Sequence, residues 1–319
     1  MNGSEPMRRK TQETRHAADE DHEGRSSSEE RPDLRIDSYD ARVLEISYAH
    51  IELLHELTIG VFWPHRRDDL RFFVDLGCGY VAVDAIGRPM ASAMAFGDGE
   101  EVNFLGMMVT PPRLQSHGAG RWLLRRLMEE RPGVDMRLSA TRSGYRLYES
   151  AGFIPVDVIR QHQGIVTRVE APCAAEGVTV RKMRTEDHSA VRALDLVAFG
   201  AGRQRTLEYL LAMTEGVVAV RDNEPCGYAL CRRFGRGEVI GPLVADDEQV
   251  AMMLAAPFVQ RAEGRFLRID TPDRGERFGG FLAAAGMGVF DTVTEMYIGN
   301  DRRPREGVRI FGLAAQSLG

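Results

Sequence analysis

The chain has 319 residues, of which 43% are hydrophobic, and it carries a formal net charge of -6. This length is sufficient for two ordinary domains with separate cores. No apolar run approaches the roughly 18 residues of a membrane-spanning helix and no basic run accumulates, so we expect neither a membrane nor a nucleic-acid partner.

Residues 1–38 contain no aromatic residue, and 17 of the 38 are Asp, Glu, Lys or Arg. Such a segment buries too little apolar area to offset the entropy lost on ordering. We therefore predict a disordered leader, with ordered sequence beginning near Tyr39. The leader has no apolar stretch of the kind a signal peptide needs, and the four cysteines show no C-x-x-C spacing. Both features predict a cytoplasmic protein with no metal site.

After the leader, the spacing of apolar residues predicts a mixed α/β unit. The expected order is two amphipathic helices, a hairpin of two strands, an apolar strand and a third helix. Leu123, Leu124 and Leu127 share one face of that third helix, which stops before Pro132–Gly133. A strand, a helix and a final strand complete the unit. The ranges expected up to the third helix are 51–60, 67–76, 79–84, 90–96, 102–109 and 121–131.

The second half of the chain repeats the first. Three short matches occur in the same order, displaced by 137, 135 and 134 residues. Matches in one order at nearly one displacement indicate two tandem copies. The paired segments are GYVAV (79–83) with GVVAV (216–220), GMMVTPP (106–112) with GPLVADD (241–247), and AGF (151–153) with AGM (285–287).

We therefore predict two like domains over residues 39–168 and 178–319, joined by a linker over 169–177. Each is expected to be a mixed, mostly antiparallel sheet flanked by helices. In the second copy the corresponding helices and strands are expected over 188–199, 205–213, 217–222, 226–232 and 239–244.

One glycine turn stands out, QSHGAG at residues 115–120. Gly118 and Gly120 stand two residues apart at the start of a helix-forming run, where backbone N–H groups lack partners and the helix dipole favours an anion. A Walker loop is excluded because Arg121 and Trp122, rather than Lys and Ser or Thr, follow the last glycine. A dinucleotide-binding fold is excluded because the turn does not follow the first strand.

The run from Leu105 to Gly120 resembles the pyrophosphate-binding motif of the GNAT acetyltransferases. That motif has an apolar strand, a proline, and then Gln or Arg followed by x-x-Gly-x-Gly or x-x-Gly-x-Ala. The positions that carry the resemblance here are Pro112, Gln115, Gly118 and Gly120.

A second signature of the same family is a tyrosine placed five residues before an aromatic residue. It is present as LYESAGF, with Tyr148 and Phe153. The segments WPHR (63–66) and QHQG (161–164) are similar to those of a bacterial branch of tandem GNAT proteins.

The resemblance implies an N-acetyltransferase that uses acetyl-CoA as its acyl donor. Amides of the glycine turn would bind the pyrophosphate, and amides of the preceding strand would bind the pantetheine. Tyr148 would be the general acid that protonates the departing thiolate. The residues implied to bind the coenzyme are Met107, Met108, Val109, Gln115, Ser116, His117, Gly118, Ala119, Gly120 and Arg121.

Three positions depart from the family pattern. Ser116 replaces the first glycine that usually follows the glutamine, and its side chain would stand next to the phosphates. Ala119 replaces the usual isoleucine between the two glycines. Thr141 replaces the asparagine that commonly precedes the tyrosine by seven residues. None of these departures removes a reacting group.

The attacking amine must be neutral, so a general base or a water relay is required. The candidates are Glu100, Glu101, His65 and His162, of which His65 is the first choice because it lies in the loop where the family admits the acceptor. We expect a small-molecule amine as acceptor. A protein lysine, or an acetyl-CoA-binding regulator that transfers nothing, is the alternative. The sequence does not predict an oligomeric state.

The second copy lacks the catalytic equipment of the first. After its GPLV strand there is no glycine, and Asp246, Asp247 and Glu248 suit helix capping but would repel a pyrophosphate. Leu282 occupies the position of Tyr148 when AGF is aligned with AGM. We therefore expect a degenerate, non-catalytic second domain.

Overall fold

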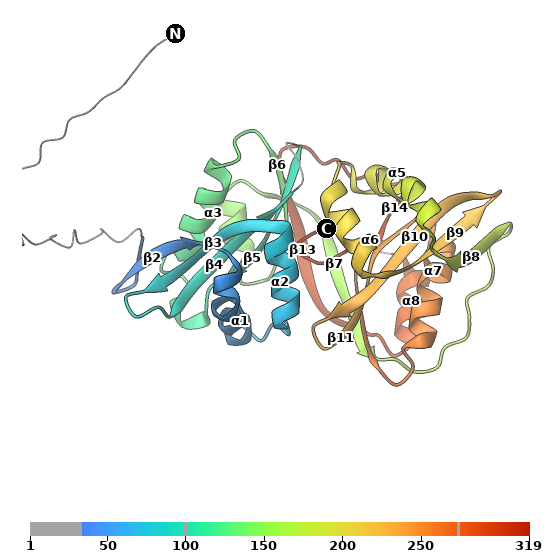
Figure 1. Cartoon of the computed structure of the whole chain (residues 1–319), viewed down its shortest axis with the longest axis horizontal. Coiled ribbons are helices and arrows are strands. Elements are labelled where there is room, and N and C mark those ends of the chain that lie inside the picture. Colours follow the sequence, from blue (N-terminus) through green and yellow to red (C-terminus); the bar gives the residue numbers. More distant parts are fainter. Residues whose placement is uncertain (1–33, 98–100, 273–274) are drawn as a thin grey trace, which may run out of the picture. The chain divides into compact units, whose positions relative to one another are not determined.

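A computed structural model of the chain describes residues 34–97, 101–272 and 275–319. Its helices and strands follow one order twice (Figure 1). We call the first pass repeat 1. It consists of β2 (Tyr39–Glu45), η1 (Tyr48–His50), α1 (Ile51–Gly60), α2 (Arg67–Leu76), β3 (Gly77–Asp84), β4 (Pro89–Phe96), β5 (Val102–Val109), η2 (Pro112–Leu114), α3 (Ala119–Glu129), β6 (Asp135–Ala140), α4 (Tyr145–Ser150) and β7 (Ile154–Ile165).

The second pass, repeat 2, has the same succession of elements, except that no described element corresponds to η2. Two strands stand outside the repeated order: β1 (Leu34–Ile36) at the start and β14 (Arg309–Gly312) near the end. Repeat 2 consists of β8 (Val178–Lys182), η3 (Thr185–Asp187), α5 (His188–Phe199), α6 (Gln204–Met213), β9 (Glu215–Arg221), β10 (Glu224–Phe234), β11 (Gly237–Ala245), α7 (Glu248–Arg261), β12 (Phe266–Thr271), α8 (Glu276–Ala284) and β13 (Val289–Ile298).

All the strands belong to one 14-stranded sheet. Its order is β1-β2-β3-β4-β5-β6-β13-β7-β12-β11-β10-β9-β8, with β14 paired to β11. Only the pairs β5–β6 and β11–β12 are parallel. The predicted mixed, mostly antiparallel α/β fold is therefore confirmed, although one continuous sheet replaces the two separate sheets that the repeats suggested.

The sheet is continuous because the repeats exchange their last strands. β13 of repeat 2 lies between β6 and β7 of repeat 1, so that Thr294 is opposite Ala140 on one side and Val158 on the other (Figure 1). The far end of β7 pairs in turn with β12, with Ile165 opposite Phe266. The expectation that each copy completes its sheet from its own residues is therefore wrong, since backbone groups along β6 and β7 are satisfied by the other copy.

The predicted domain boundaries stay a prediction. The segment predicted as the linker, residues 169–177, contains no helix or strand and joins β7 to β8. The sheet nevertheless passes from one predicted domain to the other through β13 and β7, so the linker is not the sole connection between them.

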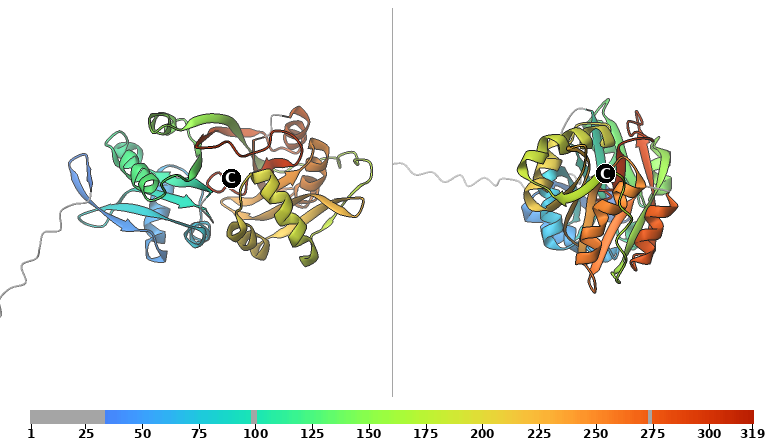
Figure 2. Two further views of the ribbon diagram at one scale, coloured as in Figure 1. Left: turned by 90° about the horizontal axis from the view of Figure 1, so that it is seen from above. Right: turned by 90° about the vertical axis from the view of Figure 1, so that its right-hand side faces the viewer.

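Helices cover both faces of the sheet. In β4 the side chains alternate: Met94 and Phe96 pack in the core beneath α1 and α2, whereas Ala93 and Ala95 pack in the core beneath α3. In repeat 2, α5 and α6 lie on one side of the strands and α7 and α8 on the other (Figure 2). No helix in the described part of the chain is both long and apolar enough to cross a membrane.

Ordered structure begins earlier than predicted. Residues 1–33 of the predicted leader lie outside the described residues, but Leu34–Ile36 form β1, a hairpin partner of β2. The start near Tyr39 is therefore wrong. The reason is Ile36, a single apolar side chain in charged surroundings, which is fully buried in the core beneath α3.

If β13 is an integral strand of repeat 1, its buried side chains determine the stability of that repeat. Met296 is fully buried against the repeat 1 core, whereas Val289 at the start of the same strand is 52% exposed. We expect Met296→Ala to lower the free energy of unfolding by about 3 kcal/mol. Val289→Ala, the matched control, should change it by less than about 0.5 kcal/mol. Urea unfolding of both variants measures this, and equal effects would contradict the assignment.

Candidate active site

A pocket of about 880 Å³ opens in repeat 1 next to the glycine turn. Three segments of the chain form its walls. They are the loop after α1 with Val61, Phe62 and Trp63, the end of β5 with the turn that leads into α3, and the segment from Thr141 to Tyr148 that follows β6.

The pocket lies where two parallel strands diverge. β5 pairs with β6 only as far as Leu105 opposite Leu138, although both strands continue beyond those residues. Past that point β5 contains a bulge, with the pairing to β4 shifted between Ser92 and Met94. Met107 in the bulge has a φ of 49°, and the Ser92 hydroxyl donates a hydrogen bond to its carbonyl oxygen at 2.8 Å. The following residues, Met108 and Val109, reach the pocket wall.

The glycine turn presents the uncapped start of α3 to this pocket. Gly118 is the N-cap residue, with a φ of 90°, and no side chain of the described residues caps the first turn. A Cβ at Gly118 would have no atom within 4 Å, so the space beside this glycine is open. Gln115 lies at the pocket wall, and its side-chain amide donates to the Thr110 carbonyl oxygen at 3.1 Å. Free amides at a helix start favour an anionic group.

The same glycine sets where α3 begins. The helix starts at Ala119, two residues before the predicted Arg121. Gly118 adopts the left-handed conformation without the penalty that a Cβ imposes, so the helix can follow directly from the turn. Ser116 also has a left-handed φ, 69°. It is the residue that replaces the usual glycine of the motif.

The charged residues of the lining are all positive. Arg121 and Arg146 line the pocket, and no carboxylate does so among the described residues. Together with the amides of the turn, these guanidinium groups make the pocket suitable for a phosphorylated ligand.

Tyr148 forms part of the opposite wall. Its ring is 7% exposed and packs edge-on to Phe153, with 6.1 Å between ring centroids. A Cβ at Gly144 would stand 3.0 Å from the Tyr148 ring, so a glycine one turn earlier makes room for it. Burial raises the pKa of the Tyr148 phenol, so the hydroxyl is protonated at neutral pH.

Most of the predicted coenzyme-binding residues meet at this pocket. Two do not reach its lining: Met107 is buried within the bulge, and His117 is directed toward Asp37, with 3.9 Å between His117 Nδ1 and the carboxylate. The predicted residues that line the pocket are Met108, Val109, Gln115, Ser116, Gly118, Ala119, Gly120 and Arg121.

His65, the predicted general base, lies elsewhere. Its ring packs against those of Trp63, Phe73 and Phe234, at centroid distances of 5.7, 5.7 and 5.3 Å. It does not line the pocket, and its buried Nδ1 has no hydrogen-bond partner among the described residues. Burial lowers the pKa of His65 to about 4. Its role as a base stays a prediction.

Two other base candidates, His162 and Glu101, also lie outside the lining of the pocket. His162 is buried, with its Nδ1 2.9 Å from the Met287 carbonyl oxygen. Glu101 approaches Arg302, with 3.4 Å between the charged groups. Glu100 lies outside the described residues.

Several residues of the lining were missed by the sequence analysis, among them Phe62, Ser143 and Arg146. Phe62 is 95% exposed with a φ of 59°, an unusual combination for an aromatic residue. Its position beside Trp63, between two predicted helices, was the available signal. Arg146 stands two residues before the signature tyrosine.

In repeat 2 the corresponding gap between strands is filled. β11 pairs with β12 only as far as Ile240 opposite Ile269, after which β14 pairs with β11. The amide of Leu313, directly after β14, then donates to the Asp270 carbonyl oxygen of β12 at 2.8 Å. Main chain therefore occupies the space that forms the pocket in repeat 1.

The helix after that gap is capped, as predicted. The Asp247 side chain accepts a hydrogen bond from the Val250 amide at 2.8 Å. Leu282, at the position of Tyr148, is fully buried in the repeat 2 core. Repeat 2 thus has neither the open turn nor the phenol.

Comparison with known proteins gives consistent results. Residues 191–312 match the model of an acetyltransferase (GNAT) domain. A relative from Bacillus subtilis, the uncharacterized N-acetyltransferase YitH, is 23% identical over 288 residues, which cover 87% of this chain and 98% of that protein. The domain match falls on repeat 2, the repeat without the glycine turn.

Solved structures show the same fold along most of the chain. A putative acetyltransferase from Pyrococcus horikoshii is 22% identical, with a TM-score of 0.69, over 88% of this chain and 96% of its own. A tandem GNAT protein from the clavulanic acid biosynthesis pathway is 14% identical, with a TM-score of 0.57, over 82% of this chain and 99% of its own.

The two left-handed residues of the turn, Ser116 and Gly118, predict substitutions that change the free energy of unfolding in opposite directions. Ser116→Gly removes the strain of a Cβ at a φ of 69° and should raise the free energy of unfolding by about 0.5 kcal/mol. Gly118→Ala introduces that strain at a φ of 90° and should lower it by about 1 kcal/mol, although the new methyl group meets no atom. Urea unfolding of both variants is the measurement, and the reverse order would contradict this account of the turn.

His65 predicts a pH dependence of stability. The unfolded residue takes up a proton near its ordinary pKa of 6.5 and the folded residue only near 4, so the unfolded state binds more protons between these values. The free energy of unfolding should therefore fall as the pH falls, by about 2 kcal/mol from pH 6.5 to pH 5. His65→Phe should remove this part of the slope. An unchanged slope in denaturant titrations across this range would show that His65 is not the cause.

Proposed function

We propose that this chain, a member of the GNAT superfamily, transfers an acetyl group from acetyl-CoA to the primary amine of a small molecule. The observation that carries the proposal is the pocket of repeat 1. An uncapped helix start with a glycine turn forms one wall, and a buried tyrosine forms the other, at the point where β5 and β6 diverge.

The pocket has groups suited to each part of the coenzyme. Amides from Gly118 to Arg121 would donate to the pyrophosphate oxygens, and the guanidinium groups of Arg121 and Arg146 would add positive charge. The backbone of Met108 and Val109, free of β6 at this point, would pair with the pantetheine amides. An amide there would also polarise the thioester carbonyl.

The transfer then needs two proton movements. The neutral amine nitrogen attacks the thioester carbon, the carbon–sulfur bond breaks and an amide bond forms. The departing thiolate takes the proton of the Tyr148 hydroxyl, and the phenolate is reprotonated by the proton that the nitrogen releases. Because the ordinary pKa of a phenol exceeds that of a thiol by about 1.5, this requires the hydroxyl within hydrogen-bonding distance of the sulfur.

A small acceptor is favoured because repeat 2 covers one side of repeat 1. Phe72 of α2 packs against Tyr209 of α6, with 5.6 Å between ring centroids. The Tyr209 hydroxyl donates to the Asp75 carboxylate at 2.6 Å. With this side covered, an acceptor would have to reach the pocket from the sides that remain open, which favours a small molecule over a folded protein.

The role of Tyr148 predicts a specific kinetic effect. Tyr148→Phe keeps the ring but removes the proton, so kcat should fall by about 100-fold or more while the Kd for acetyl-CoA changes little. Tyr145→Phe is the matched control on the same helix, since Tyr145 does not line the pocket. Turnover of both variants with an amine acceptor decides this, and an unchanged kcat for Tyr148→Phe would remove the residue from the mechanism.

The filled gap of repeat 2 predicts one acetyl-CoA per chain. Calorimetric titration should therefore give a stoichiometry of one, and Gly118→Leu should abolish the heat of binding. Two sites would contradict the non-catalytic assignment of repeat 2. Tight binding by wild type without transfer to any amine would instead favour a regulatory acetyl-CoA-binding protein.

A further inference from the structure

A second pocket, of about 310 Å³, lies near the strand that repeat 2 contributes to repeat 1. We call it the arginine pocket because four arginines line it: Arg137 on β6, and Arg303, Arg305 and Arg309 in the segment between β13 and β14 and in β14 itself. Its lining includes Pro272, the first residue after β12, just as Thr141, the first residue after β6, lines the coenzyme pocket.

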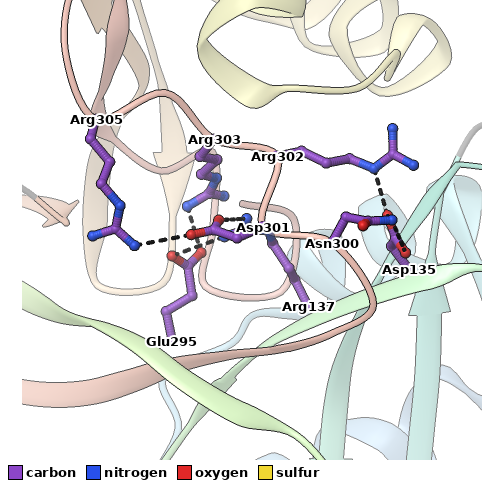
Figure 3. A network of polar contacts seen from close by, with 8 residues as sticks. All are labelled: Asp135, Arg137, Glu295, Asn300, Asp301, Arg302, Arg303 and Arg305. Atoms are coloured by element: carbon purple, nitrogen blue, oxygen red, sulfur yellow. Dashed lines mark hydrogen bonds and ion pairs between the residues drawn. The ribbon is translucent and has the colours of Figure 1, made fainter.

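The carboxylates of the arginine pocket do not balance its arginines. Glu295 and Asp301 are shared by three guanidinium groups, which converge on them in Figure 3. Arg137 is 3.4 Å from Glu295 and also pairs with Asp301, while Arg305 is 3.0 Å from Asp301. Asp157 is the third carboxylate of the lining. Among the described residues of the lining, four guanidinium groups thus face three carboxylates, which leaves one positive charge in excess.

Two of the arginines differ in how they are placed. Arg303 pairs with Glu295 through one terminal nitrogen, while its Nε and other terminal nitrogen are buried, without an acceptor among the described residues, near the rings of Phe104 and Phe199. Arg309 is half-buried and forms no ion pair within the described part of the chain. Its contacts are the carbonyl oxygens of Asp246 and Gly307, at 3.2 and 3.3 Å, and the ring of Phe311. Arg309 thus keeps its charge without a carboxylate partner among these residues.

The neighbouring residues show what a closed structural network looks like. Asp135 accepts from Arg302 Nε at 2.6 Å and from the Asn300 amide at 3.2 Å (Figure 3). Arg302 also approaches Glu101. This group pairs both of its acidic residues with donors, and none of its residues lines the arginine pocket. The arginine pocket differs in keeping both free space and unused donors.

We propose that the arginine pocket binds a small oxyanion, either a phosphate group or a carboxylate, through Arg305 and Arg309. The guanidinium fork matches both groups in geometry and charge. A bound oxyanion would accept from these two exposed or half-buried guanidinium groups and neutralise the excess charge. The ligand would bridge the repeats, because Arg137 belongs to repeat 1 and the other arginines follow β13. The proposal does not depend on the acetyltransferase function.

Calorimetric titration of the full chain with inorganic phosphate tests the proposal, at constant ionic strength maintained with chloride. Saturating coenzyme A is present throughout, so that the glycine turn is not available to phosphate. We expect saturable binding of one phosphate per chain. Arg309→Gln should weaken it by about tenfold or more, since it removes a charged hydrogen-bond donor. A parallel titration with malonate distinguishes a carboxylate ligand from a phosphate ligand.

Two further variants serve as controls. Arg305 is 72% exposed, so Arg305→Gln leaves the fold intact and should also weaken binding. Arg265→Gln, at an arginine 57% exposed and outside the pocket, should change the Kd by less than twofold. Equal affinities of all three variants would overturn the proposal. So would heats that do not saturate, which indicate an adventitious ion only, or binding that occurs only without coenzyme A, which would place the anion at the glycine turn.

Discussion

The pairing of β13 with both β6 and β7 is the constraint on which the rest of the structure depends. Two strands of repeat 1 would each present an unpaired edge without it, and buried backbone groups need partners. β6 leads directly into the segment from Thr141 to Tyr148, which forms one wall of the repeat 1 pocket. The geometry of repeat 1 therefore rests on a strand that repeat 2 supplies.

The gap between two diverging parallel strands is open in repeat 1 and filled in repeat 2. Both contain a pair of parallel strands that separate after a few residues. In repeat 1 the separation leads to an open pocket, bordered by a helix start that no side chain caps. In repeat 2 β14 occupies the separation, and Asp247 caps the following helix. The position that forms an open pocket in repeat 1 is thus a packed and internally satisfied structure in repeat 2, with an arginine-lined space alongside it.

The helices and strands were largely predictable from the sequence, whereas the pairing of distant strands across the sheet was not. The helices over 51–60, 67–76 and 188–199 have the predicted bounds because apolar periodicity and breaking residues mark their ends in the sequence. The glycine turn and Tyr148 meet at one pocket, as the spacing of the motifs implied. The exchange of β13 was not predictable, because the pattern of a strand specifies which of its faces is buried and not which distant strand it pairs with. The packing of His65 against three aromatic rings was not predictable either, because one of these rings, that of Phe234, comes from a distant strand in repeat 2.

The exchanged strand has a consequence for how the protein is made. Ala140 on β6 can pair only after its partner on β13, Thr294, has been synthesised, and Thr294 is 154 residues further along the chain. At the usual ribosomal speed of about 5–20 residues per second, that interval lasts on the order of 10–30 s. Throughout it the nascent first half exposes two strand edges, which are sites of aggregation. Repeat 1 can thus complete its sheet only after nearly the whole polypeptide has left the ribosome, and its yield will depend on protection of those edges during translation.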